Sequence, residues 1–204
     1  PNNTIQHAGL VIAPYTSHSI LTMYSKEEKE EYGYVSRAKC INNYSAVTAA
    51  CLMCEKSVFE KAGGFDSEDL TVAYNDVDLC LTLYELGYDN IFTPYCEAYH
   101  YESISRGYED SLEQIERREK EKSVLKKKHS FLFRNGDPFY NKNLTLFSVK
   151  SEISSEVSSS YLDFVGLPWS EKRIIEIDLK KKQKNRVCIF SHYDKADEIS
   201  DYVV

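Results

Sequence analysis

Two acidic residues and a histidine are the side chains of this sequence best suited to catalysis. Asp76 and Asp78 stand at the start of an apolar run, and His100 follows a strand-like segment further along the chain. Two positions along a helix differ by about 200° of rotation, so the two carboxylates would face different ways. The set suits deprotonation of a hydroxyl group beside a metal-bound phosphate. We expect Asp76 to be the chemical group and Asp78 its structural partner.

A helix is predicted to begin at Asn75 and to end before Gly87. The Asn75 side chain can accept hydrogen bonds from the free N–H groups of the first turn. Asp78, at the third helical position, is expected to interact with the same N–H groups through the helix dipole. Gly87 is typical of the residue that follows a helix, because it adopts the left-handed conformation without strain. The apolar residues expected on the buried side are Val77, Leu79, Leu81, Leu83 and Leu86.

Further elements are predicted around this helix. A short helix at 57–62 is expected to end at Gly63 and Gly64, and a segment at 46–53 is expected to be buried. Strands bounded by turn residues are predicted at 5–12, 89–93 and 98–101, the last of which would carry His100 towards a loop. A long charged surface helix is predicted at 109–128, with a thin apolar stripe formed by Leu112, Ile115, Val124 and Leu125.

The composition is that of a globular protein without a nucleic-acid partner. Of 204 residues, 42% are hydrophobic and 28% are charged, which is enough for one domain with a core. The net charge of −7 argues against nucleic acid, because phosphate backbones need a clustered positive surface. The 16 Tyr side chains suit sugar-binding clefts as well as amphipathic cores.

The cytoplasm is the expected location. No run approaches the roughly 18 apolar residues that span a bilayer, and no signal peptide is recognised at the start. The 6 Cys residues are scattered, and most are interpreted as small buried side chains in a reducing compartment. Cys51 and Cys54 form a C-x-x-C pair, but no second pair follows at zinc spacing.

Three regions are expected along the chain. Residues 1–147 would form the domain that carries the motifs, 148–185 a polar linker, and 186–204 the first strand of a second α/β domain. Strand-like runs lie close to both ends of the chain. We therefore expect the sequence to be a segment of a longer protein.

The ordered motifs of 1–147 resemble a known family. As a set they resemble the acceptor-side half of the family 2 glycosyltransferases, an inverting group with the GT-A fold. Segments 103–107 and 137–145 resemble the O-antigen and rhamnan-type branch of that family. The motifs in question are Thr48-Ala49-Ala50-Cys51, Gly63-Gly64-Phe65-Asp66, Asn75-Asp76-Val77-Asp78-Leu79-Cys80-Leu81 and His100-Tyr101-Glu102.

The resemblance implies a fold class and a set of site residues. The fold would be α/β, the C-terminal half of a GT-A domain with a mixed sheet and flanking helices. Asp76 matches the general base, and His100 matches a histidine that joins the metal and diphosphate site, with Mg²⁺ or Mn²⁺ as the cation. Arg106 falls in a segment that could close over the diphosphate. The positions that match the acceptor pocket are Thr48, Ala49, Ala50 and Asp66.

The resemblance also implies partners. The donor would be a nucleotide sugar, with dTDP-rhamnose suggested by the rhamnan-type segments. The acceptor would be a glycan or a lipid-linked glycan, and the latter would bring the protein to the inner membrane as a peripheral partner. No D-x-D motif of the donor half precedes Gly63, so this chain alone is expected to be inactive. Thr82 stands where the family usually has Arg, and Ala49 or Ala50 where it usually has Gly.

Two other functions are compatible with the same residues. The missing donor motif and the many Tyr residues would also fit a non-catalytic carbohydrate-binding or scaffold module. A metal-dependent hydrolase could use Asp76, Asp78 and His100, although the helix geometry turns the two acids apart. Taken singly, Asp76 could be only a helix-start acid and His100 only a surface histidine.

Overall fold

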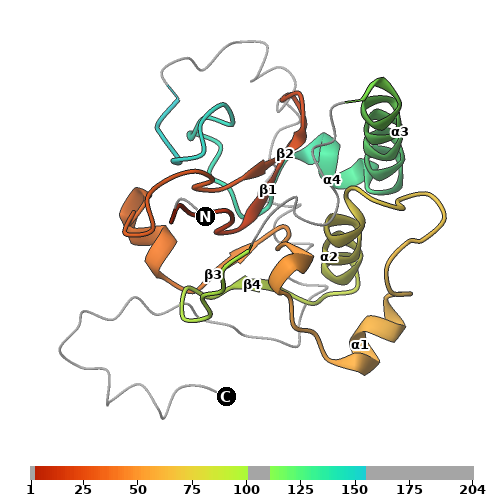
Figure 1. Cartoon of the computed structure of the whole chain (residues 1–204), viewed down its shortest axis with the longest axis horizontal. Coiled ribbons are helices and arrows are strands. Elements are labelled where there is room, and N and C mark those ends of the chain that lie inside the picture. Colours follow the sequence, from red (N-terminus) through yellow and green to blue (C-terminus); the bar gives the residue numbers. More distant parts are fainter. Residues whose placement is uncertain (1–2, 101–110, 155–204) are drawn as a thin grey trace, which may run out of the picture. The chain divides into compact units, whose positions relative to one another are not determined.

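The computed structural model describes residues 3–100 and 111–154 of the chain. In that part, two antiparallel strand pairs form, and Figure 1 shows them beside helices α2, α3 and α4. Strand β1 (Leu10–Ala13) pairs with β2 (Ser19–Thr22), so that Leu10 faces Thr22 and Ala13 faces Ser19. Strand β3 (Asn42–Tyr44) pairs with β4 (Asn90–Phe92). The predicted mixture of helices and strands is confirmed, but a single mixed sheet of the GT-A type does not form in the described residues.

The strand β1 lies at the centre of the core. Leu10 and Ile12 belong to one cluster of buried residues, whereas Val11 and Ala13 belong to a second cluster. This division follows from the pleat of a strand, which turns successive side chains to opposite faces. Backbone hydrogen bonds of 2.9 and 3.2 Å also join Leu10 to Ala46, just after β3. The two strand pairs are therefore linked through β1.

Helix α2 (Asn75–Glu85) packs on the first cluster through its buried face. Val77, Cys80 and Leu81 belong to this cluster, at the spacing that brings side chains onto one helix face. The predicted burial of Leu79 and Leu83 is also confirmed. The predicted burial of Leu86 is wrong, because this residue is the C-cap and its side chain is 43% exposed.

The two ends of α2 show what local sequence can predict. At its end, the N–H groups of Gly87 and Tyr88 bond to the carbonyls of Tyr84 and Leu83, both at 2.9 Å, and Gly87 has a φ of 92°. This is the expected glycine termination. At its start, the predicted capping by Asn75 was wrong. Asn75 is the first helical residue, Tyr74 occupies the N-cap position with a φ of 63°, and no side chain caps the helix.

Helix α1 (Lys56–Lys61) ends as predicted. Gly63 and Gly64 have φ angles of 87° and 72°, and their N–H groups bond to the carbonyls of Glu60 and Phe59. The segment that precedes α1 differs from its prediction, because the 3-10 turn η2 (Ala49–Cys51) is exposed. The other 3-10 turn, η1 (Tyr34–Lys39), follows the charged segment 26–31.

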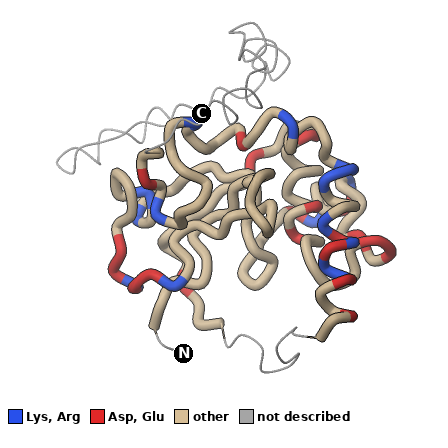
Figure 2. The backbone as a smooth tube through the Cα atoms, turned by 90° about the horizontal axis from the view of Figure 1, so that it is seen from above, with Lys and Arg blue, Asp and Glu red and all other residues tan. Residues whose placement is uncertain are grey.

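The long charged helix is confirmed as α3 (Leu112–Lys128), and the short α4 (Ser130–Asn135) follows it. Ser111 and Gln114 form the capping box that begins α3. Figure 2 shows the mixed acidic and basic residues of this helix on the right of the view. The apolar stripe is shorter than predicted, since Leu125 is buried but Leu112 is 80% exposed.

Two strand predictions need correction. The first strand begins at Leu10 rather than at residue 5, because Gly9 has a φ of 105° that breaks the extended conformation. Residues 98–100 form no strand, and residue 101 lies outside the described part.

In the predicted linker, the described residues 148–154 include Ile153, which bridges to Leu144. Residues 155–204, with the predicted second domain, lie outside the described part. Among the helices of residues 3–100 and 111–154, none is long and apolar enough to cross a membrane.

Candidate functional site

A cavity of about 620 Å³ lies beside the start of α2. Its lining comes from four stretches of chain that are distant in sequence: the N-terminal segment with the β1–β2 hairpin, Thr48 before η2, the start of α2, and Val149. Among the residues on its wall, those with polar side chains suited to binding or catalysis include Gln6, His7, His18, Thr48, Tyr74 and Asp76. The predicted base and one predicted acceptor residue therefore share one cavity.

The Asp76 carboxylate is held in a fixed direction by backbone groups. Its Oδ2 accepts the N–H of Ala49 at 3.0 Å, and its Oδ1 accepts the N–H of Val77 at 2.9 Å. Each oxygen of an ionised carboxylate can accept a second hydrogen bond. The half-buried Asp76 therefore keeps acceptor positions for a hydroxyl group that enters the cavity.

His7 is a part of this site that the sequence did not reveal. Its Nε2 accepts hydrogen bonds from the N–H groups of Gly9 and Thr48, both at 3.2 Å. Burial lowers the pKa of His7 to about 4, although the Asp76 charge acts in the opposite direction. The ring is therefore neutral at pH 7 and carries its proton on Nδ1. Because it lies in an apolar, strand-like run, its spacing gave no sign of this role.

The turn after Thr48 connects His7 to Asp76. Thr48 is the N-cap of η2, and its Oγ1 accepts the N–H of Ala50 at 3.4 Å. The next residue, Ala49, donates its N–H to Asp76. The predicted acceptor residues thus reach the cavity by different means: Thr48 lines it, and Ala49 contributes a backbone group to Asp76.

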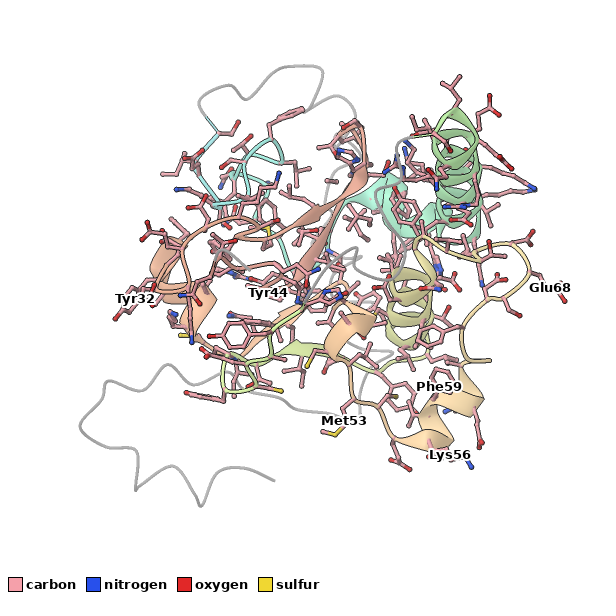
Figure 3. All side chains as sticks on the ribbon, in the orientation of Figure 1. Tyr32, Tyr44, Met53, Lys56, Phe59 and Glu68 are labelled. Carbon is pink, nitrogen blue, oxygen red and sulfur yellow. The ribbon has the colours of Figure 1, made fainter. Side chains whose placement is uncertain are left out.

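The side chains near η2 show that segment 46–53 is not buried as a whole. Ala46 is only 1% exposed, but Met53 is 97% exposed. Figure 3 shows Met53 directed away from the protein and Tyr44 within it. Since η2 lies at the surface, Ala50 is accessible at the edge of the site.

His100 lies next to the cavity without lining it. Its Nδ1 forms a hydrogen bond of 2.7 Å with Oε1 of Gln6, a residue on the cavity wall. This contact leaves Nε2 as the ring nitrogen that a cation could use. No group of three His, Cys, Asp or Glu side chains suited to a metal forms within residues 3–100 and 111–154. His100 could offer one imidazole ligand, but the described residues do not bring together the three ligands of the hydrolase hypothesis.

Asp66 is not among the residues that line the cavity. Its Oδ1 accepts the N–H groups of Asp69 and Glu68 at 3.0 and 3.1 Å, and its Oδ2 lies 3.4 Å from Nζ of Lys128. The backbone bond from Asp69 makes the largest contribution to lowering the pKa of Asp66. Arg106, the predicted diphosphate residue, lies outside the described part of the chain.

Asp78 is a structural residue, as expected, but with different partners. Its buried carboxylate lies 2.8 Å from Nε2 of His129 and 2.8 Å from Nζ of Lys128. Burial alone would raise the pKa of Asp78, but these partners lower it overall. The expected interaction with the free N–H groups of the helix is therefore replaced by a link to the junction of α3 and α4.

A second buried acid fixes the loop before α2. Glu121 is 3% exposed and accepts hydrogen bonds from Oγ1 of Thr71 at 3.0 Å and from the N–H of Ala73 at 2.7 Å. The N–H of Val72 also donates a hydrogen bond to Oε1 of Glu121, at 3.3 Å. Because these residues directly precede α2, Glu121 helps to position Asp76 at the cavity.

Comparisons with known proteins find two partial relatives. The chain is 44% identical over 151 residues to "Uncharacterized protein y4gI" of Sinorhizobium fredii (strain NBRC 101917 / NGR234), a match that covers 72% of this chain and 16% of that protein. It is 31% identical over 148 residues to "O-antigen biosynthesis protein RfbC" of Myxococcus xanthus, covering 72% of this chain and 11% of that protein. No family model matches the chain. No solved structure matches it either.

These relatives are much longer than the chain. The match spans less than a fifth of either protein. The sequence is thus homologous to one part of each relative, and no family is assigned by this similarity.

Proposed function

We propose that this chain forms the acceptor side of a metal-dependent inverting glycosyltransferase that acts in bacterial cell-surface polysaccharide synthesis. The observation that supports the proposal most directly is the Asp76 carboxylate at the cavity wall, oriented by the N–H groups of Ala49 and Val77. The partial similarity to a protein named for O-antigen biosynthesis supports the polysaccharide context.

Asp76 would act as the general base. An acceptor hydroxyl in the cavity would donate a hydrogen bond to the carboxylate, and its oxygen would attack the anomeric carbon of the donor sugar. The proton would pass to Asp76 as the bond between that carbon and the diphosphate oxygen breaks. Because the two backbone donors fix the carboxylate, little reorganisation is needed before the transfer.

Thr48 and Tyr74 would bind the acceptor. Both line the cavity with Asp76, and the Tyr74 hydroxyl is held by the carbonyl of His18 at 3.3 Å. An aromatic ring with a fixed polar end suits the apolar face of a sugar. Ala50 would add contact at the exposed edge of the site, whereas Asp66 would need to act from outside the cavity.

The donor would be a nucleotide sugar, with dTDP-rhamnose as the first choice to test. A divalent Mg²⁺ or Mn²⁺ ion would offset the charge of its diphosphate, and hard cations of this kind accept mainly oxygen ligands with an occasional imidazole. His100 would provide that imidazole through Nε2, while Gln6 holds the ring through Nδ1. Arg106 would contact the diphosphate, and a lipid-linked acceptor would bring the protein to the inner membrane.

The test is sugar transfer by the complete polypeptide that carries this segment. Purified protein would be incubated with labelled dTDP-rhamnose and other nucleotide sugars, an O-antigen-type acceptor, and Mg²⁺ or Mn²⁺. We expect labelled product with at least one donor, and its loss in EDTA. Binding of the acceptor glycan without transfer from any donor would contradict the proposal and favour a carbohydrate-binding module.

A further inference from the structure

Two cysteines that are far apart in the sequence meet at the surface. The Sγ atoms of Cys51 and Cys96 lie 3.9 Å apart, although 45 positions separate the two residues. Both residues are exposed. The expectation that most cysteines are buried is therefore wrong for the described residues, in which Cys80 is buried and the others are partly or fully accessible.

We propose that Cys51 and Cys96 are a redox modification site, at which a reversible disulfide joins η2 to the segment between β4 and His100. The distance between the two sulfurs is close to van der Waals contact, so a small approach would bring them to the bond length of about 2.05 Å. Both thiols are also open to a small oxidant, which is the second requirement for exchange.

The oxidant would be a low-molecular-weight disulfide such as oxidised glutathione. One cysteine thiolate attacks a sulfur of that disulfide, forms a mixed disulfide and releases one small thiolate. The second cysteine thiolate then attacks the protein sulfur of the mixed disulfide and releases the other small thiolate. The two protons of the cysteines pass to the released thiolates, and two electrons reduce the small disulfide to two thiols.

The surroundings of the pair favour an intramolecular product. Glu97, next to Cys96, forms a surface ion pair of 2.8 Å with Lys29. Cys51 is the last residue of η2, and Thr48 is the N-cap of the same turn. Because the two sulfurs lie 3.9 Å apart in the fold, ring closure should compete well with a second attack by free glutathione.

The thiol pair should react slowly at neutral pH and faster in base. The hydrogen bond and the nearby sulfur of Cys96 raise the pKa of Cys51 above its ordinary value. Because the thiolate is the attacking species, the reactive fraction increases with pH up to that raised pKa. A disulfide at this position would form under oxidative conditions and would open again when a reducing pool returns.

The position of the pair gives the bond a consequence for the cavity. Cys51 shares η2 with Ala49, whose N–H bonds to Asp76, and Cys96 leads towards His100. A covalent link would hold these two segments at one separation. The proposal concerns the thiols alone, so its test does not depend on whether the protein transfers sugar.

The test is disulfide mapping of the chain. The reduced protein would be treated with oxidised glutathione at pH 8.5, alkylated, digested and examined by mass spectrometry. We expect one peptide pair linked through Cys51 and Cys96, which dithiothreitol separates. Cys51→Ser and Cys96→Ser should each abolish the link, whereas Cys40→Ser and Cys54→Ser should keep it.

Other products would overturn the proposal. These are a Cys51–Cys54 disulfide within the C-x-x-C sequence, stable glutathione adducts on both cysteines, or two unreacted thiols under conditions that oxidise a control dithiol. As a second measurement, the melting temperature should rise by about 5–10 °C on oxidation of the original protein and stay unchanged in Cys96→Ser.

Discussion

His129 and Asp78 form a buried pair in which Nε2 of the ring lies 2.8 Å from Oδ1 of the carboxylate. Their side chains are only 1% and 3% exposed. The other ring nitrogen of His129 lies 3.0 Å from Glu85, and Lys128 contacts the second oxygen of Asp78. This cluster fastens the first turn of α2 to the junction between α3 and α4.

The pair should make the unfolding free energy depend on pH in two directions. Burial lowers the pKa of His129, but its carboxylate partners outweigh burial and raise it above 6.5. Its contribution is therefore complete below pH 6.5 and is lost as the pH rises through the raised value. The pKa of Asp78 is lowered from 3.8, so its contribution is complete above pH 3.8 and is lost as the pH falls through the lowered value.

Replacing the His129 ring tests this pH dependence. His129→Gln should reduce the unfolding free energy at pH 6 by about 2–4 kcal/mol, because it removes one of the two charged partners of the buried Asp78 carboxylate and leaves only Lys128. Urea unfolding between pH 5 and 9 would measure the unfolding free energy of both proteins. The decline above pH 6.5 should disappear in His129→Gln and persist in His18→Gln, which changes an exposed histidine. An unchanged decline in His129→Gln would show that another group causes it.

Asp137 should be the most sensitive acid in the core. Its Oδ2 accepts the N–H of Ile12 and the hydroxyl of Ser45, each at 2.6 Å, and its Oδ1 accepts the N–H of Phe139 at 2.8 Å. Asp137→Asn would turn an amide N–H₂ towards at least one of these donors, so we expect a loss of about 2–4 kcal/mol.

The pH dependence gives a second readout for Asp137. Burial raises its pKa from 3.8 to about 6, so the fold loses stability as the pH rises from 3.8 to about 6. This slope should be absent in Asp137→Asn and present in Asp69→Asn, which changes an exposed acid. Equal stability curves for the original protein and Asp137→Asn would contradict the role of this carboxylate.

Gly9 should tolerate no side chain. A Cβ atom at this position would lie 2.4 Å from the Tyr44 ring, and the φ of 105° is itself unfavourable for other residues. Since Tyr44 is 1% exposed and cannot move aside, Gly9→Ala should cost more than about 2 kcal/mol. Gly87→Ala is the matched control, because φ is 92° there but no atom lies within 4 Å. Equal losses in chemical denaturation would show that backbone conformation alone matters.

The sequence predicts the elements whose causes are local. The apolar spacing in α2, and the glycines after α1 and α2, each act within a few residues, so these helices are where they were expected. The N-cap of α2 was predicted wrongly, because Glu121, about fifty positions away, fixes the preceding loop, and Tyr74 takes the left-handed conformation at the cap position. No local pattern reports such a contact.

The residues of the candidate site also divide into those that the sequence identified and those that it did not. Asp76 could be selected from its type and position and Thr48 from the family resemblance, and both line the cavity. The partners that surround the acidic and acceptor residues could not be selected from the sequence. His7 contacts Thr48 across 41 positions, and His129 contacts Asp78 across 51. These contacts depend on how β1, α2 and α3 pack, which the residue types alone do not determine.

The general-base role of Asp76 is the central claim, and transfer kinetics of one substitution test it most directly. In the complete polypeptide, Asp76→Asn keeps the size of the side chain but cannot take a proton. We predict that kcat falls by about 10²–10⁴-fold while the Kd of the nucleotide sugar changes less than about threefold. Glu68→Gln, at an exposed position of the loop before α2, is the control and should keep full activity. Transfer by Asp76→Asn at the rate of the unsubstituted protein would contradict the account.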